Sequence, residues 1–303
     1  MFFCNKISIS LEGGCIMLGK PKKVACIHDL SGVGRCSLSV ILPTMSAMGS
    51  QACPIPTAVL STHTGGFGDV VIRDLTDYTI PSYEHYKRLQ IKFDCVYSGF
   101  LASANQIDHC REFFDGYKKS LKVVDPVMGN HGKLYRTYTT EMKKRMCELV
   151  EIADIITPNV TEASMLLNEE YPISPMTSTQ AKSWLVRLAE IGPSIVVITG
   201  IVLAGAEKCN IGYDKNNGAF WRVRCDYVPV HYPGTGDIYA SVLIGALLRG
   251  ESLPIAMNRA TGFIELAAKT TYGYGSEPRE GLMIEPCIEW LTSNITMKDY
   301  TNL

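Results

Sequence analysis

The sequence predicts an α/β protein of three layers, in which helices cover both faces of a mainly parallel central sheet. Short apolar runs typical of buried strands alternate with apolar residues at helical spacing along nearly the whole chain. Unusual polar residues follow several of these strands, and the carboxyl ends of parallel strands meet at one edge of a sheet. We find no internal repeat, low-complexity segment or linker. The pattern therefore indicates an αβα sandwich with a ligand site at that edge.

Composition excludes several classes of protein. The 303 residues carry a formal net charge of −1 without a basic stretch, so we expect no nucleic-acid partner. No apolar run approaches the roughly 18 residues of a membrane span, so no membrane partner is expected either. The eleven cysteines are scattered singly, which is typical of reduced thiols in a cytoplasmic protein. The six histidines are scattered too, so a structural zinc site is not expected.

Residues 1–20 read differently from the rest of the chain. They lack the periodicity of the remainder and also the apolar core of a signal peptide. We expect them to be a leader that is not part of the native protein, with Met17 as the natural start. Residues 21–303 are then expected to form a single domain.

The first half of this domain is predicted to alternate strands with helices. The first strand ends at His28 and leads into a glycine-containing turn over residues 29–34. The first helix ends at Gly49, and three glycines within residues 65–68 mark a loop after the second strand. The expected strands cover residues 24–28, 57–61, 95–99 and 122–125, and helices are expected within 38–48, 83–91, 107–117 and 142–150.

The second half continues the alternation. A helix begins at Asn159, and Asn217-Gly218 favours a tight turn between two polar-alternating strands. The expected strands cover residues 155–158, 194–199, 209–214 and 219–227, and further helices are expected within 184–191, 238–247 and 254–270.

A glycine turn organises this half of the chain. Pro233-Gly234-Thr235-Gly236-Asp237 stands directly before an apolar helical run. Free N–H groups and the positive end of the helix dipole meet at such a turn, which makes an anion site. A carboxylate beside an anion is costly unless it has work to do, such as taking a proton from a nucleophile. The alternative is a plain helix start, because the dipole favours Asp there.

Oxygen-bearing side chains at two other strand ends suit a magnesium ion. Asp125 ends one strand, and Asn159 and Glu162 stand one helical turn apart after the next. Carboxylate and amide oxygens with water between them suit Mg²⁺, which keeps much of its hydration shell. For Asn159 and Glu162 the alternative is an N-terminal capping pair. For Asp125, which Pro126 follows, the alternative is a strand-ending turn.

Three more polar residues follow predicted strands. Thr199 is either a phosphate ligand or an ordinary strand residue, and His63 is either a site residue or a satisfied core histidine. Asp29 follows the first strand. Magnesium-binding acids and an anion turn with its own base together describe phosphoryl transfer, in which Asp237 deprotonates an attacking hydroxyl.

Five segments then carry a family resemblance by their motifs and their order. They cover residues 27–32 with Gly34, then 58–65, 123–129, 156–162 and 233–237. Together they resemble the ribokinase-like superfamily and, within it, the pyridoxal/pyridoxamine kinase family, over about residues 23–290. The resemblance implies a ribokinase-like kinase domain with ATP as co-substrate and Mg²⁺ as cofactor; a monovalent cation such as K⁺ is a further candidate. It also implies transfer of the γ-phosphoryl group to the 5′-hydroxymethyl group of vitamin B6, which serves salvage of the phosphorylated cofactor, and a homodimer.

The resemblance also implies roles for single residues. Asp237 is the expected base, and the backbone N–H groups of Gly234, Thr235 and Gly236 are the expected anion hole. The implied metal residues are Asp125 and Glu162, and the implied ATP contacts are Asn159, Thr199, Gly234 and Gly236. The implied vitamin contacts are Asp29, Ser61, His63, Thr64 and Phe100.

Two positions depart from the family pattern, and two rival functions stay open. Asp29-Leu30 stands where Ser-His is frequent, and Phe100 stands where Tyr is frequent, so both bear on the vitamin contacts. The nearest rival is the hydroxymethylpyrimidine kinase of thiamine synthesis, which often has Cys in place of Asp237. A catalytically silent relative that only binds vitamin or nucleotide is the other rival. The intact Asp237, Asp125 and Glu162 speak against it.

Overall fold

The structure, a computed structural model, describes residues 10–11, 14–15, 20–135, 138–205, 207–226, 228–292 and 300–303. The expected leader therefore lies mostly outside the described residues. The part of it that is described consists of two short strands, β1 (Ser10–Leu11) and β2 (Gly14–Cys15), which pair with each other in antiparallel fashion, and Lys20.

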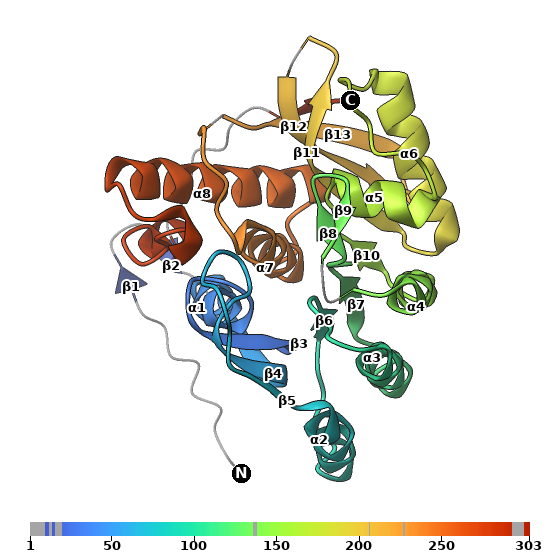
Figure 1. Ribbon diagram of the computed structural model, residues 1–303, viewed down its shortest axis with the longest axis vertical. Helices are drawn as coiled ribbons and strands as arrows, with labels where there is room; N and C mark the ends of the chain where they lie inside the picture. Colours follow the sequence, from blue (N-terminus) through green and yellow to red (C-terminus); the bar gives the residue numbers. More distant parts are fainter. Residues whose placement is uncertain are drawn as a thin grey trace.

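A ten-stranded sheet forms the middle of the molecule, in the order β14-β13-β12-β11-β10-β7-β6-β3-β4-β5 (Figure 1). The six strands from β11 to β4 are parallel, whereas the strands at both edges are antiparallel. The strand bounds are β3 Lys22–Val33, β4 Ser50–Thr62, β5 Ile72–Asp74, β6 Cys95–Ser98, β7 Leu121–Val124, β10 Ile155–Ile156, β11 Ile195–Leu203, β12 Glu207–Asp214, β13 Ala219–Arg224 and β14 Tyr300–Asn302. A separate hairpin is made by β8 Gly129–Asn130 and β9 Lys133–Leu134.

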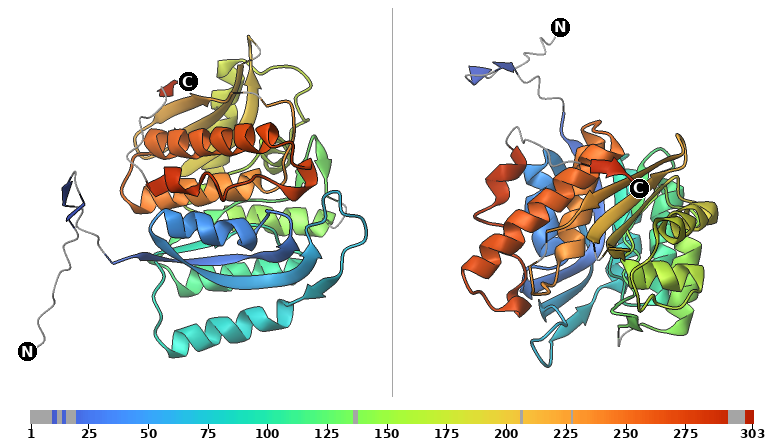
Figure 2. Two further views of the ribbon diagram at one scale, coloured as in Figure 1. Left: turned by 90° about the vertical axis from the view of Figure 1, so that its left-hand side faces the viewer. Right: turned by 90° about the horizontal axis from the view of Figure 1, so that it is seen from above.

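Helices cover both faces of this sheet, so the three-layer prediction is confirmed. Figure 1 shows α1, α7 and α8 on one side of the sheet and α2 to α6 on the other, and Figure 2 shows the same layers from two further directions. The helix bounds are α1 Leu38–Ala47, α2 Thr76–Arg88, α3 Ala104–Gly116, α4 Thr140–Val150, α5 Val160–Leu167, α6 Ser178–Ile191, α7 Thr235–Leu248 and α8 Leu253–Gly273, with short 3₁₀ helices at η1 Pro278–Glu280 and η2 Ile288–Thr292.

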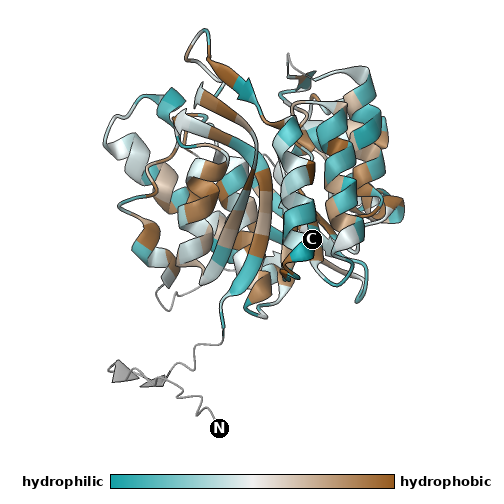
Figure 3. Ribbon diagram, turned by 90° about the horizontal axis from the view of Figure 1, so that it is seen from below, coloured by the Kyte–Doolittle hydropathy of each residue, from teal (hydrophilic) through white to brown (hydrophobic). Residues whose placement is uncertain are grey.

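Apolar packing holds the layers together. The predicted stripe of α3 is buried between its helix and the sheet, as Ile107, Phe113 and Phe114 show. Figure 3 shows hydrophobic residues along the strands, while the helices carry both hydrophobic and hydrophilic residues. Helix α7 is buried almost throughout because α1 and α8 flank it. In the described part of the chain, no helix is both long and apolar enough to cross a membrane.

The first strand of the domain is longer than predicted. It continues past His28 to Val33, so the predicted turn over residues 29–34 is wrong. Residues 30–33 are held in the strand by pairing with β4, which their serine- and glycine-containing sequence does not predict. The ladder shifts between His28 and Leu30, which leaves one extra residue in β4 opposite Asp29. Asp29 therefore lies at a β-bulge within the strand and not at its end.

Strand β4 also begins earlier than predicted, although it contains Pro54 and Pro56. Proline cannot donate to a ladder and is confined to edges and bulges. These two prolines are two residues apart, so their nitrogens face the same side of the strand. Strand β5 pairs only with residues 58–60 of β4. The missing N–H groups therefore face the open edge, where no ladder bond is lost.

Candidate active site

The predicted glycine turn lies at the amino end of α7, at the carboxyl edge of the parallel strands. Gly234 has φ 78°, and a Cβ atom there would collide with the carbonyl oxygen of Arg35. Only glycine meets both requirements. The turn therefore packs directly against the segment that precedes α1. The first N–H groups of α7, which have no partner within the helix, follow this contact in the chain.

Asp237 is buried in the first turn of α7. Its Oδ2 accepts a hydrogen bond from the Ser37 N–H at 2.8 Å and a weaker one from the Cys36 thiol at 3.5 Å. Burial raises the pKa of Asp237 to about 6, with the Asp29 carboxylate adding to the rise and the Ser37 N–H opposing it. A carboxyl group with this pKa is ionised at neutral pH and still accepts a proton readily.

Asp125 and Glu162 lie close enough to Asp237 to repel it. Burial raises the pKa of Asp125 well above its ordinary value, and the charges of Glu162 and Asp237 raise it further. Burial likewise raises the pKa of Glu162 to about 8, although backbone N–H groups oppose that rise. The Asp125 carboxylate also faces Gly236, since a Cβ there would stand 3.6 Å from Asp125 Oδ2. Three acids and the anion turn thus share one site.

Asn159 and Glu162 form a complete capping box at the start of α5. The Asn159 side chain accepts a hydrogen bond from the Glu162 N–H at 3.0 Å, and Glu162 Oε2 accepts one from the Asn159 N–H at 2.8 Å. Glu162 Oε1 accepts a third from Met128. The capping alternative is therefore realised in the structure. It leaves free lone pairs on the carboxylate, so capping does not exclude a second role.

Thr199 lies beside Asn159, as the sequence-based reading requires. The two residues form a parallel bridge, and the Thr199 N–H donates to the Pro158 carbonyl at 3.0 Å. The predicted strand end at Thr199 is wrong, because β11 continues to Leu203 beyond an irregular register. Gly200, with φ 69°, lies within that irregularity, directly after Thr199.

The donor set fits a hydrated magnesium ion more readily than a fully protein-ligated metal. Among the described residues, no group of three His, Cys, Asp or Glu side chains has the geometry to hold a metal ion. Mg²⁺ commonly takes one or two carboxylates and completes its shell with water and phosphate oxygens. Asp125 and Glu162 supply two buried carboxylates whose mutual repulsion a cation would relieve.

The Asp29 carboxylate is buried and is hydrogen-bonded by two serine hydroxyls. Its Oδ1 accepts a hydrogen bond from the Ser37 hydroxyl at 2.6 Å, and its Oδ2 accepts one from the Ser31 hydroxyl at 3.1 Å. Both carboxylate oxygens therefore have protein partners. Through Ser37, Asp29 is connected to Asp237.

The other expected vitamin contacts lie on the β4 side of the site. His63 is buried, with Nδ1 accepting from the Gly65 N–H at 3.0 Å and Nε2 lying 2.6 Å from the Arg279 carbonyl, so it ties the glycine loop to η1. Ser61 accepts from the Val71 N–H at 3.1 Å at the sheet edge. Thr64 is exposed, and Phe100 is half-buried after β6.

Sequence reasoning missed two buried groups beside Asp237: His28 and Ser37. His28 Nδ1 stands 3.8 Å from Asp237 Oδ1, and its ring packs on Tyr97 with centroids 4.5 Å apart. Burial lowers the pKa of His28 to about 3, so the ring is neutral. Within the described residues, neither ring nitrogen has a hydrogen-bond partner. A histidine inside an apolar strand was the available signal, whereas a serine before a helix suggests only a cap.

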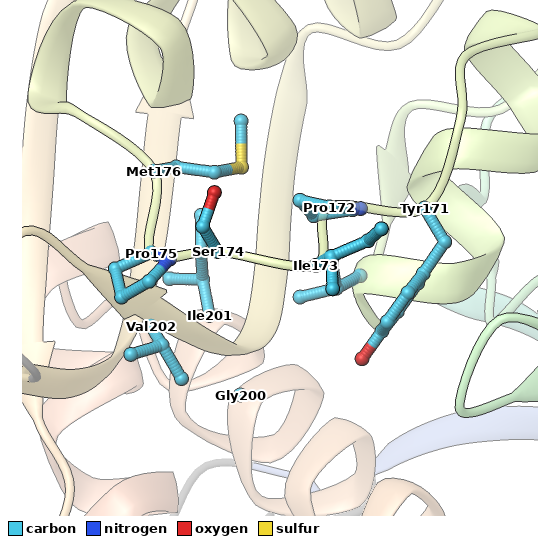
Figure 4. A pocket seen from close by; sticks show the side chains of 10 residues that line it. Tyr171, Pro172, Ile173, Ser174, Pro175, Met176, Gly200, Ile201 and Val202 are labelled. Carbon is cyan, nitrogen blue, oxygen red and sulfur yellow. The ribbon is translucent and has the colours of Figure 1, made fainter.

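A cavity of about 320 Å³ lies apart from the acids, on the α5 and α6 side of β11. Figure 4 shows Tyr171 and Ile173 on one side of it and Pro175, Met176 and Val202 on the other. Its lining contains no acidic side chain, and it meets the site only through Val160 and Gly200, the neighbours of Asn159 and Thr199. We therefore take the acids around Asp237, and not this cavity, as the candidate active site.

An αβα sheet whose carboxyl edge brings a glycine turn together with buried acids is the arrangement expected of a kinase of small molecules. Comparison with known proteins then gives the family. A family model described as phosphomethylpyrimidine kinase matches residues 41–280, and the chain belongs to this family. The expected ribokinase-like fold and the likeness to pyridoxal kinases are thereby confirmed.

Solved structures and relatives agree with that family. A Bacteroides thetaiotaomicron protein, named provisionally as a phosphomethylpyrimidine kinase and crystallised with pyridoxal, is 41% identical, with a TM-score of 0.89 and coverage of 94% of this chain and 100% of that one. Pyridoxal kinase from Lactobacillus plantarum is 30% identical, with a TM-score of 0.82 and coverage of 89% and 96%. Pyridoxal kinase PdxY of Deinococcus radiodurans is 24% identical over 84% of this chain and 89% of its own.

Proposed function

We propose that the protein transfers the γ-phosphoryl group of ATP to the 5′-hydroxymethyl group of vitamin B6: pyridoxal, pyridoxine or pyridoxamine. The observation that carries the proposal is the buried Asp237 at the anion turn, with a pKa raised to about 6. The crystallisation of a 41% identical relative with pyridoxal supports the choice of vitamin.

In this proposal Asp237 takes the proton from the vitamin hydroxyl, and the oxygen of that hydroxyl attacks the γ-phosphorus of ATP. The O–H bond and the bond from the γ-phosphorus to the bridging oxygen break, a new P–O bond forms, and ADP leaves. The N–H groups of Gly234, Thr235 and Gly236 stabilise the charge on the transferred group. Asn159 and Thr199 would contact the remaining phosphates.

Asp125 and Glu162 would hold Mg²⁺ through water and phosphate oxygens. When bound, the ion would neutralise charge on the phosphates. Asp125 faces the glycine turn at Gly236, while Glu162 takes part in the capping box of α5. Both acids have pKa values raised by burial, so a cation would be expected to draw protons from them.

A substrate panel tests the proposal directly. Purified protein with ATP and Mg²⁺ is assayed on pyridoxal, pyridoxine, pyridoxamine, hydroxymethylpyrimidine and ribose, with and without a chelator. We expect phosphorylation of a B6 form that the chelator abolishes. Turnover of hydroxymethylpyrimidine alone would move the protein to the other branch of its family. ATP binding without turnover of any compound would support the silent-binder alternative.

A further inference from the structure

Ser37 does not behave as a helix-capping serine. It occupies the N-cap position of α1 with φ 53° and ψ −137°, and its side chain makes no capping hydrogen bond. This backbone region suits glycine and is strained for serine. Ser103 at the start of α3 provides the ordinary case, since it has φ −152° and ψ 160° and its hydroxyl accepts from the Gln106 N–H. Strain of this kind gathers at functional sites.

The N–H and the hydroxyl of Ser37 donate to two acids instead of capping α1. The Ser37 N–H donates to Asp237 Oδ2 at 2.8 Å, and the Ser37 hydroxyl donates to Asp29 Oδ1 at 2.6 Å. The hydroxyl of Ser31 donates to the second Asp29 oxygen at 3.1 Å. All four residues are buried. A continuous chain of hydrogen bonds therefore leads from β3 to the proposed base.

We propose that Ser37 is a positioning residue that fixes the orientation of Asp237, and that Asp29 and Ser31 hold Ser37 in place instead of contacting the vitamin. The inference rests on the proposed role of Asp237 as the base. With Oδ2 fixed by the Ser37 N–H, Oδ1 is the oxygen that takes the proton. In the described part of the chain, no hydrogen bond is made to Oδ1.

The groups around Asp237 account for its titration. Burial is the main cause of the raised pKa of Asp237; the Ser37 N–H favours the ionised form, whereas the Asp29 carboxylate disfavours it further. Losing the N–H contact and losing the Asp29 charge should therefore move the titration of Asp237 in opposite directions. Among the described residues, the titratable groups that interact with Asp237 from the surrounding elements are His28, Asp29, Cys36, Tyr97, Asp125, Tyr135 and Glu162.

The test compares Ser37→Ala and Asp29→Asn with Ser103→Ala, a matched serine at another helix start. For each protein, kcat and KM for ATP and pyridoxal are measured from pH 5 to pH 9. Ser37→Ala keeps the backbone N–H but loses the hydroxyl that ties residue 37 to Asp29, so the N–H should shift away from Asp237 Oδ2. This loss of orientation should lower kcat of the variant by about 10- to 100-fold, with both KM values within about twofold of wild type. The midpoint of its kcat–pH profile should rise. Asp29→Asn still accepts the Ser37 hydroxyl but lacks the charge, so its midpoint should fall.

Ser103→Ala should lower the melting temperature through the lost cap without moving kcat or the midpoint. Wild-type kcat and midpoint in Ser37→Ala would overturn the proposal, as would a loss expressed only in the KM for pyridoxal, which would make Asp29 and Ser37 vitamin contacts. If Ser37→Ala does not fold, the kcat–pH midpoint of Asp29→Asn tests the proposal: a lower midpoint supports it, and an unchanged midpoint overturns it. If the wild type leaves pyridoxal unchanged, the proposed substrate is rejected. A substrate-free ¹³C NMR titration of the Asp237 carboxyl then still tests the positioning.

Discussion

At the scale of single residues, the environment of Asp237 sets what this carboxylate can do. It is buried, it accepts one firm hydrogen bond, and its pKa of about 6 lies just below neutrality. A base works only in its ionised form, so wild-type kcat/KM should fall about tenfold per pH unit below pH 6 and level off above it. The pH dependence of the initial rate measures this midpoint.

Replacing that carboxylate should remove the proton acceptor and little else. Asp237→Asn keeps an oxygen for the Ser37 N–H, so the turn should stay folded. We expect kcat to fall by about 10²- to 10⁴-fold, with the affinity for ATP nearly unchanged. Steady-state kinetics and a nucleotide-binding titration measure the two quantities. More than about half of the wild-type kcat in this variant would contradict the role of Asp237 as base.

At the scale of elements, the site depends on the close packing of two helix starts. The segment before α1 meets the turn before α7 at Arg35 and Gly234. That segment also contributes Ser37, the N-cap of α1, while α7 contributes Asp237. The same turn contains two glycines that differ in their structural requirements. Gly234 needs its positive φ, whereas a Cβ at Gly236 would make only an ordinary contact with Asp125.

The two glycines therefore predict two different outcomes. Gly234→Ala should lower the melting temperature by several degrees, since the strain and the collision with Arg35 together cost on the order of 1–3 kcal/mol. Gly236→Ala should melt within about two degrees of wild type, yet lose activity because its methyl group crowds the anion turn. Thermal melts and kcat of both variants check this. Equal melting temperatures would contradict the packing described for Gly234.

At the scale of the whole molecule, the buried acids make stability depend on pH. Asp237 and Glu162 have folded-state pKa values of about 6 and about 8, above their ordinary values of 3.8 and 4.5. The folded protein therefore binds more protons than the unfolded chain, and its free energy of unfolding falls as pH rises through this window. For Asp237 alone the loss is on the order of 3 kcal/mol.

Asp237→Asn should consequently be more stable than the wild type at pH 8. Most of this difference should be gone at pH 4, where the carboxyl group is protonated in the folded state and partly protonated in the unfolded chain, whose pKa is 3.8. Melting temperatures of both proteins from pH 4 to pH 8, without metal or nucleotide, measure the difference. A constant difference across this range would show that Asp237 does not titrate as its burial requires.

Local patterns in the sequence predicted most of the fold and the acidic core of the site. Periodicity located the strands and helices, and strand ends located Asp125 and Glu162, because these features depend on neighbours in the chain. The extension of β3 through Asp29 depends on its ladder with β4, and β14 exists only through its pairing with β13. The strained Ser37 was hidden for the same reason, since its partners are distant in sequence.

The contact between Cys36 and Asp237 has a chemical consequence for substrates that carry an aldehyde. A thiol beside a catalytic centre would ordinarily be open to capture by an electrophile, but only the thiolate is a strong nucleophile. Burial raises the pKa of Cys36 well above its usual range, and the charges of Asp237 and Asp29 raise it further. The carboxylate proposed as the base thus also helps to keep the neighbouring thiol protonated. If the proposed reaction on pyridoxal is correct, its aldehyde should therefore not be trapped by Cys36 as a thiohemiacetal.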